Sequence, residues 1–353
     1  MKPPFSITPE ILDTISRIER LIGRIESLDQ PKTQPHLRKS NRVRTVQGSL
    51  AIEGNTLNLD QVTALIEGKT VVGKKEEIRE VLNAIEIYDQ ISTYDPLSMK
   101  QLKTAHQVMM DGLIKRAGQW RSSHVGIMKG SEVSHVAPQA KRVEALMMDL
   151  FQFLKESKDH LLIKGCIFHH ELEFIHPFED GNGRMGRFWH SLLLYQYHPT
   201  FEFIPVESLI KEHQQDYYDA LEKSDQLGES TPFVTFSLSV ILKALEDFID
   251  VLRPVPLTAE ERLQKAAEHF VRTYFSRKDY LDYFKTISSA TASRDLKQGV
   301  SNNLLCRKGD KAQTKYQFKW PVLATSNLNE HFFISQIHKC GVLWTVFCFD
   351  PAV

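Results

Sequence analysis

Isoleucines spaced three or four residues apart lie near the start of the chain. Ile11, Ile15, Ile18, Ile22 and Ile25 are separated mainly by charged and polar residues, which predicts an amphipathic helix over residues 10–28. An apolar stripe of this kind is stable only when it packs against another element.

Helical spacing recurs as far as residue 252. It predicts helices over residues 37–52, 76–90, 97–113, 141–155, 164–174, 208–224 and 232–252, and an apolar helix that follows residues 176–187 and ends near residue 197. Residues 119–138 differ, because β-branched residues, glycine and serine predict a short hairpin or loop there. A succession of helices with one short β segment predicts a mainly α fold.

A proline-containing linker, residues 253–256, separates a second region of different charge. Residues 257–318 hold twelve Lys or Arg against seven Asp or Glu, a net charge of +5. Their order predicts a helix, a short helix over 278–284, a helix over 288–300 and a strand pair around 308–311. The predicted domains are therefore 1–95, an N-terminal helical region; 96–252, the core; 257–318; and an unassigned tail, 319–353.

Composition excludes several classes of protein. The four cysteines form no C-x-x-C pair, which argues against a disulfide scaffold or a cysteine-only zinc site. No apolar run approaches the roughly 18 residues of a membrane span, and the first residues lack the apolar segment of a signal peptide. We therefore expect a cytoplasmic protein without a membrane partner.

Residues 176–187, with the sequence HPFEDGNGRMGR, contain the groups of a phosphate site. A glycine-rich loop that opens a helix binds anions through its backbone N–H groups. Arg184 and Arg187 lie on one face of the next turn, where guanidinium groups can bind phosphate oxygens. Asp180 suits Mg²⁺, which often binds one carboxylate together with substrate phosphates. His176 stands at the loop entrance, and histidine is well suited to act as a general base near neutral pH.

On this segment the chain resembles the Fic (Fic/Doc) family, whose signature H-P-F-x-[D/E]-G-N-G-R-x-x-R it matches in full. Most members of that family transfer AMP from ATP to a hydroxyl of a target protein. The resemblance implies a Fic-type helical core with a short β-hairpin flap. It also implies a role for each position: His176 deprotonates the target Ser, Thr or Tyr, Asp180 holds Mg²⁺, Gly181, Asn182 and Gly183 form an anion hole, Arg184 and Arg187 hold the β- and γ-phosphates, and Phe178 anchors the loop.

The resemblance extends to positions with weaker signals. Gly118–Arg121 and the following Val125–Met128 resemble the family's flap, which pairs with an extended target segment; the alternative is an ordinary exposed hairpin. Tyr217, Tyr218 and Asp225 fall where the family contacts adenine and ribose, although aromatic pairs on helices are usually core. His169 is interpreted as structural. The residues assigned to ATP in this way are Glu53, Val125, Gly126, Ile127, Met128, Gly181, Asn182, Gly183, Arg184, Met185, Gly186, Arg187, Tyr217, Tyr218 and Asp225.

A second segment, Ser49-Leu-Ala-Ile-Glu53-Gly54, resembles the family's inhibitory helix signature, [S/T]-x-x-x-E-[G/N]. A carboxylate at that helix end would pair with Arg187 and occupy the place of the γ-phosphate. Loss of one phosphate ligand and a misaligned ATP would suppress transfer. The alternative is a surface glutamate near the end of a helix.

Residues 257–318 resemble the winged-helix (α+β) domains often appended to such proteins. Residues 288–297 would form the recognition helix and residues 307–316 the wing, with basic residues that suit phosphate contacts. Winged helices bind DNA or dock proteins, so DNA binding through residues 288–316 and protein docking both stay open. The family also implies a homodimer.

The leading hypothesis is therefore an ATP- and Mg²⁺-dependent protein adenylyltransferase, capable of self-modification and inhibited by Glu53. One alternative uses the same site to remove AMP from a modified protein, with Glu53 orienting a water. Another is a DNA-binding regulator switched by nucleotide, which would have no use for His176. A kinase of the Doc type is disfavoured, since such proteins usually lack the second arginine and carry a larger residue at the position of Gly183.

Overall fold

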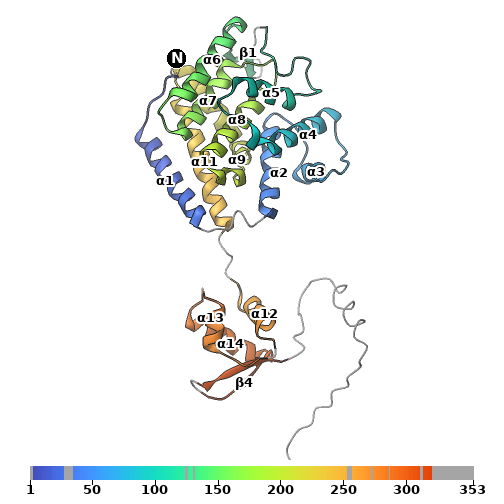
Figure 1. Ribbon diagram of the computed structural model, residues 1–353, viewed down its shortest axis with the longest axis vertical. Helices are drawn as coiled ribbons and strands as arrows, with labels where there is room; N and C mark the ends of the chain where they lie inside the picture. Colours follow the sequence, from blue (N-terminus) through green and yellow to red (C-terminus); the bar gives the residue numbers. More distant parts are fainter. Residues whose placement is uncertain are drawn as a thin grey trace, which may run out of the picture. The chain divides into compact units, whose positions relative to one another are not determined.

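In the computed structural model the isoleucine stripe forms α1 (Pro9–Ser27), as the spacing predicts. Four of its five isoleucines are buried, and α1 packs along the long helix α11 (Thr231–Leu252) (Figure 1). Each fully buried isoleucine contributes about 1.5–3 kcal/mol. The stripe therefore fixes the N-terminal helix to a helix more than two hundred residues away in sequence.

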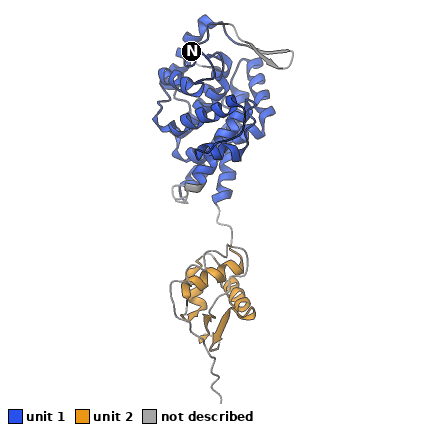
Figure 2. Cartoon of the chain, turned by 90° about the vertical axis from the view of Figure 1, so that its right-hand side faces the viewer, with its two compact units in different colours: residues 1–254 blue, residues 255–353 orange. Residues whose placement is uncertain are grey.

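The structure describes residues 3–27, 35–123, 126–129, 132–252, 257–271, 273–285, 287–310 and 313–319. The chain divides into two compact units, residues 1–254 and residues 255–353 (Figure 2). The expected linker at 253–256 and residues 320–353 of the tail lie outside the described residues.

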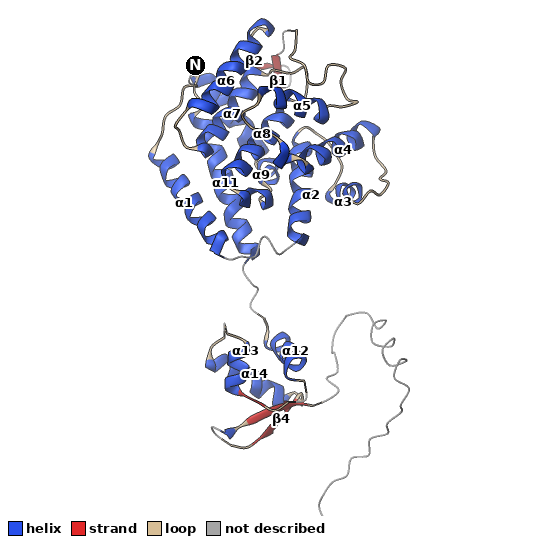
Figure 3. Cartoon of the chain, in the orientation of Figure 1, coloured by secondary structure: helices blue, strands red, loops and turns tan. Residues whose placement is uncertain are grey.

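Unit 1 is built almost entirely from helices (Figure 3). Besides α1 and α11 they are α2 (Pro35–Ile52), α3 (Leu59–Ile66), α4 (Lys75–Asp89), α5 (Met99–Met109), α6 (Val143–Glu156), α7 (Leu161–Ile175), α8 (Asn182–Tyr197), α9 (Val206–Glu212) and α10 (Gln214–Leu227). The prediction of a mainly α fold is confirmed.

Helices α7 and α8 lie side by side in the middle of this unit (Figure 1). Both are buried on most sides, with Phe168 and Trp189 fully inaccessible. Helix α2 packs against α9 so closely that a Cβ on Gly48 would lie 2.8 Å from the backbone nitrogen of Ser208. The loop that joins α7 to α8 is consequently carried by the most rigidly packed part of the protein, with α2 held beside it.

Two features of unit 1 differ from the expectation. Helix α3 was not predicted, although Asn58 and Gln61 form a capping box at its start, a pattern that marks helix N-termini. The predicted helix over 208–224 is two helices, α9 and α10, which meet at His213. Ile210, Tyr217 and Ser224 are buried seven residues apart, so the apolar spacing continues across the break and conceals it.

The predicted short hairpin is present between α5 and α6. Strand β1 (Gly126–Lys129) pairs antiparallel with β2 (Glu132–Val136), and the paired residues run from Gly126 with Val136 to Lys129 with Glu132. A register shift falls between Ile127 and Met128. A bulge at this point bends the ribbon locally.

The described residues of unit 2 form three helices and a small antiparallel sheet. Its elements are α12 (Ala259–Phe270), β3 (Phe275–Ser276), α13 (Arg277–Tyr283), α14 (Ser289–Ser301), β4 (Leu305–Lys308) and β5 (Lys315–Phe318), with strand order β3-β5-β4. The helix and strand order expected from the sequence is thus found, with the additional short strand β3. A separate apolar core includes Tyr280, Leu296 and Phe318.

Among the described helices, none has both the length and the apolar character that crossing a membrane requires.

The core of unit 2 contains a buried ion pair, which leads to a prediction about its stability. Arg262 on α12 donates to both carboxylate oxygens of Asp295 on α14, from Nε at 2.6 Å and Nη2 at 2.9 Å. Asp295→Ala leaves that guanidinium without its partner, and we expect unit 2 to lose about 3–5 kcal/mol. Calorimetry should show its transition at a lower temperature, with that of unit 1 unchanged.

The matched control is Asp310→Ala, because the Asp310 side chain is 92% exposed and surface ion pairs contribute little. Equal shifts for the two variants would contradict the assignment of Arg262 and Asp295 as a structural pair.

Candidate active site

Residues 176–181 connect α7 to α8 through two left-handed backbone conformations. His176 directly follows α7 with φ 50° and ψ 61°, and Gly181 directly precedes α8 with φ 80°. Glycine adopts this region freely, whereas for histidine it costs on the order of 1–2 kcal/mol. Surrounding contacts must therefore hold His176 in place.

A buried arginine supplies those contacts. Arg121 is only 4% exposed, and its guanidinium donates to the carbonyls of His176 at 2.6 Å and Ile175 at 3.2 Å. Its backbone N–H donates to the Pro177 carbonyl at 2.9 Å. These bonds satisfy carbonyls that the end of α7 leaves without intrahelical partners. The sequence placed Arg121 in the flap, and the structure shows that it orders the backbone of the loop.

His106, on α5, fixes the other half of the loop. Its ring stacks on Phe178 at 3.7 Å between centroids; Nδ1 accepts from the Gly118 N–H at 2.8 Å, and Nε2 lies 2.9 Å from the Asp180 carbonyl oxygen. These partners assign the proton to Nε2. Burial lowers the pKa of His106 to about 4, so the ring is neutral near pH 7. No pattern in the sequence singled out this residue.

The side chain of Asn182 closes the loop on itself. Its Oδ1 accepts from the Phe178 N–H at 2.8 Å and its Nδ2 donates to the Phe178 carbonyl at 3.0 Å. Phe178 itself is fully buried, as expected of the loop anchor. The N–H groups of the first turn of α8, which have no acceptors inside the helix, are left for an anion.

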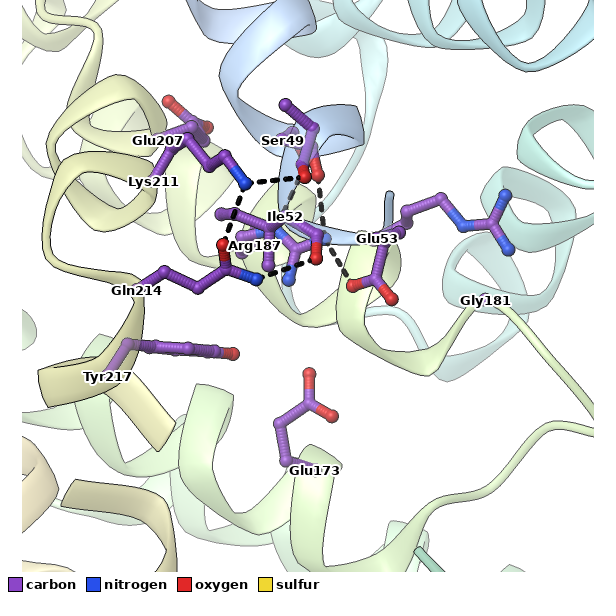
Figure 4. A network of polar contacts seen from close by, with 12 residues as sticks. Ser49, Ile52, Glu53, Glu173, Gly181, Arg187, Glu207, Lys211, Gln214 and Tyr217 are labelled. Atoms are coloured by element: carbon purple, nitrogen blue, oxygen red, sulfur yellow. Dashed lines mark hydrogen bonds and ion pairs between the residues drawn. The ribbon is translucent and has the colours of Figure 1, made fainter. Parts of the chain in front are cut away.

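The end of α2 lies over Arg187, the second arginine of the 176–187 segment (Figure 4). Arg187 donates from Nε to the Ser49 hydroxyl at 3.2 Å, and from Nη2 to the Ser49 carbonyl at 3.0 Å and to Glu53 Oε1 at 2.6 Å. Burial works to lower the pKa of Arg187, but Glu53, Tyr217 and Glu173 together raise it above its ordinary value, with Glu53 contributing most among them. A Cβ at Gly183 would overlap the Glu53 carboxylate, so glycine leaves room for the carboxylate in this position.

Side chains from α9 and α10 hold the end of α2 in that position. Lys211 Nζ donates to the Ala51 carbonyl at 2.8 Å, and Gln214 Nε2 donates to the Ile52 carbonyl at 2.9 Å (Figure 4). Both carbonyls belong to the last turn of α2, where carbonyl groups lack the N–H donors that a further helical turn would supply. Sequence reasoning missed both residues, because they lie about 160 positions from the carbonyls that they cap.

Arg184, the first arginine, is held between two carboxylates. Its Nη1 lies 2.9 Å from Glu80 Oε1 on α4, and its Nη2 lies 3.1 Å from Asp180 Oδ2. Arg184 is 5% exposed and Arg187 is 1% exposed. Among the described residues, Nε of Arg184 and Nη1 of Arg187 have no hydrogen-bond partner. Two buried N–H groups without acceptors at the start of α8 are the property of an anion site.

Asp180 is the carboxylate that fits a magnesium ion beside such an anion. Its side chain is 59% exposed at the edge of the loop, and one carboxylate with substrate phosphates is a common environment for Mg²⁺. Within the described residues, no group of three or more His, Cys, Asp or Glu side chains is arranged to hold a metal.

Comparison with known proteins identifies the family. The model of the Fic/DOC family matches residues 96–194. A crystal structure of a Fic family protein from Desulfovibrio desulfuricans covers 91% of this chain and 99% of its own length, with 36% identity and a TM-score of 0.69. The chain belongs to the Fic/DOC family. Its helical fold is the Fic fold, and members are typically nucleotidyltransferases that use ATP and Mg²⁺.

Curated relatives of this Fic protein are more distant. The protein adenylyltransferase Fic of Aedes aegypti is 26% identical over 267 residues, which cover 70% of this chain and 51% of the relative. That of Culex quinquefasciatus is 24% identical and covers 73% and 56%. The chain thus spans about half the length of these relatives. Fic-1 of C. elegans, at 20% identity and a TM-score of 0.58, shares the fold.

The remaining predicted contacts of the Fic site lie farther from the loop. Tyr217 is buried and its hydroxyl lies 3.1 Å from His169 Nε2, while Tyr218 is 40% exposed and donates to the Ile52 carbonyl at 3.4 Å. Asp225 lies 3.3 Å from His170. Gly126, Ile127 and Met128 form β1, and Val125 lies outside the described residues. The adenine and flap assignments stay predictions.

The buried histidines lead to a prediction about pH. The pKa values of His106 and His190 are lowered by burial from 6.5 to about 4. Between these values the unfolded chain binds protons that the folded chain does not, so stability falls as the pH falls, by about 1.4 kcal/mol per pH unit for each histidine. Urea unfolding at pH 7 and pH 5 measures this slope.

His106→Gln, which cannot titrate, should reduce the slope, whereas His213→Gln, whose side chain is 51% exposed, should leave it unchanged. An unaltered slope in His106→Gln would show that His106 is not held neutral by the fold.

Proposed function

We propose that this Fic protein is a protein adenylyltransferase that transfers AMP from ATP to a hydroxyl group of a target protein. The observation that carries the proposal is the pair of buried guanidinium groups, Arg184 and Arg187, at the start of α8. Each has an N–H without an acceptor among the described residues. A triphosphate supplies several acceptors at once and compensates both charges.

In the proposed reaction His176 accepts the proton of the target hydroxyl. The hydroxyl oxygen forms a new bond to the α-phosphorus of ATP, the bond from that phosphorus to the bridging oxygen breaks, and pyrophosphate leaves. The N–H groups of the first turn of α8 would stabilise the charge on the phosphate oxygens. Arg121 contributes by fixing the His176 backbone, because a general base acts only within hydrogen-bond reach.

A bound Mg²⁺, held by Asp180, would neutralise phosphate charge and orient the leaving pyrophosphate. The exposure of the Asp180 carboxylate supports this role. Its contact with Arg184 places metal ligand and phosphate ligand side by side.

We further propose that Glu53 inhibits the enzyme from within the same chain. Its carboxylate occupies Nη2 of Arg187, and the Ser49 hydroxyl and carbonyl occupy the rest of that edge. An arginine whose Nε and Nη2 already donate to other groups has fewer N–H groups available for a γ-phosphate. The Lys211 and Gln214 bonds to the end of α2 support the proposal, because they hold the segment that carries Glu53 beside Arg187.

The target, in this proposal, pairs with the β1–β2 hairpin as an extended segment, since strand edges bind peptides through backbone hydrogen bonds. A homodimer and self-modification stay expectations from the family.

A second candidate function belongs to unit 2. Helix α14 begins with a Ser288 cap and exposes Arg294 and Lys297, while Arg307 and Lys308 are exposed on β4. A basic helix followed by a basic hairpin favours a winged helix that binds DNA through phosphate contacts.

The first test uses intact mass after incubation with ATP and Mg²⁺. Glu53→Gly should release Arg187 and produce a protein heavier by one or more AMP groups, at least tenfold faster than the wild type, since one charge-assisted phosphate contact contributes about that much. Adding His176→Ala should abolish the gain.

The matched control is Glu67→Gly, because Glu67 also precedes a glycine at a helix end but pairs with Lys39 and Lys69 on the surface. A gain of a bare phosphate would indicate a kinase. No gain in any variant would argue against transfer and favour removal of AMP from a modified protein, with Glu53 orienting the water.

DNA binding by unit 2 is tested by titrating labelled duplex DNA at increasing salt. Replacing both Arg294 and Lys297 by alanine should weaken binding about tenfold or more and flatten its salt dependence. Equal affinity of the wild type and the double variant would exclude α14 as the DNA-binding element.

A further inference from the structure

Glu80, on α4, is a charged residue of the site that belongs neither to residues 176–187 nor to the segment 49–54, and the proposed function gives it no role. Its Oε1 lies 2.9 Å from Arg184 Nη1, and its Oε2 accepts from Asn55 Nδ2 at 2.8 Å. The Glu80 side chain is 22% exposed and that of Arg184 is 6% exposed. A carboxylate this enclosed, with both oxygens engaged, holds its partner in one orientation.

The Arg184 nitrogen that Glu80 binds determines which edge of the guanidinium Glu80 leaves uncovered. A guanidinium presents Nε and Nη2 along one edge and Nη1 on the far side. Glu80 takes Nη1, whereas Nε has no acceptor among the described residues and Nη2 contacts only Asp180 in the loop. The edge of Arg184 that Glu80 leaves uncovered is therefore the one on the side of Asp180, where forked donors can bind phosphate.

Arg187 shows the opposite arrangement. Glu53 and Ser49 occupy its Nε and Nη2, and Nη1 is the nitrogen without a partner. Carboxylates from the N-terminal helices thus contact both arginines, but Glu53 lies on the Nε and Nη2 edge of Arg187, whereas Glu80 lies on Nη1 of Arg184 and leaves the corresponding edge to the loop. This difference separates an inhibitory contact from an orienting one.

We propose that Glu80 is a positioning residue that holds Arg184 by Nη1 and directs its Nε and Nη2 edge toward the phosphates of the nucleotide. The proposal rests on ATP as the ligand of the proposed function. Asn55 orients Glu80 in turn, because its amide also donates to the Glu77 carbonyl at 3.0 Å and is fixed at the start of α4. Without Glu80, Asp180 would be the one carboxylate left on Arg184 among the described residues, and the guanidinium would be held only by the residue proposed to bind the metal ion.

The test compares Glu53→Gly with Glu53→Gly/Glu80→Gln by isothermal titration calorimetry with ATP, in EDTA and in Mg²⁺. We expect Glu80→Gln to weaken ATP binding roughly tenfold in both buffers, the loss that removal of an orienting partner typically causes. The Mg²⁺ concentration for half-maximal AMP transfer should rise, while transfer at saturating ATP and Mg²⁺ changes less. Glu76→Gln, an exposed carboxylate of the same helix, is the control and should match Glu53→Gly alone.

A double-mutant cycle separates positioning from a general structural effect. Because Glu80 acts only through Arg184, Glu80→Gln should cause no further loss of ATP affinity once Arg184→Ala is present. If Glu80→Gln does not fold, Glu80→Asp, which keeps the charge but withdraws it, takes its place in the same cycle.

Unchanged ATP affinity in Glu80→Gln would overturn the proposal, and so would tighter binding, which would make Glu80 a second inhibitory carboxylate. Equal losses with and without Arg184 would overturn it as well. If Glu53→Gly binds ATP but transfers no AMP, the proposed function fails, whereas the ATP titrations still decide the role of Glu80.

Discussion

A positive charge that is almost completely removed from water determines how the site is built. Arg187 is 1% exposed, and a buried guanidinium costs several kcal/mol unless acceptors surround it. In this structure the acceptors come from the last turn of α2, through Ser49 and Glu53. The position of α2 therefore matters to the whole unit, and the close contact at Gly48 and the bonds from Lys211 and Gln214 all serve to fix it.

The loop of residues 176–181 is also held by buried side chains, which form hydrogen bonds with its backbone N–H and carbonyl groups. Arg121 binds the carbonyls at its start, Asn182 binds Phe178 in its middle, and His106 contacts its end at Asp180. None of these three side chains is needed to touch a substrate. Their combined effect is to hold the strained backbone of His176 and the start of α8 in place.

The sequence predicts those parts of the site in which residue type and local spacing determine the chemistry. Residues 176–187 are contiguous, so their glycines, arginines and histidine are recognised together, and the Ile11–Ile25 stripe predicts its helix because burial repeats every three or four residues. Arg121, His106, Glu80 and Lys211 were not predicted, because each acts on a backbone or side chain far away in sequence. The break between α9 and α10 at His213 was not predicted either, because the buried positions keep their spacing across it.

The absence of a side chain at Gly183 has a consequence for how such chains can differ. A Cβ there would overlap the carboxylate of Glu53 where it now lies, so a larger residue would displace that carboxylate. A chain with such a residue must move the end of its glutamate side chain before the carboxylate can reach the arginine one turn later. The residue at position 183 therefore sets how much room a carboxylate from the end of α2 has beside Arg187.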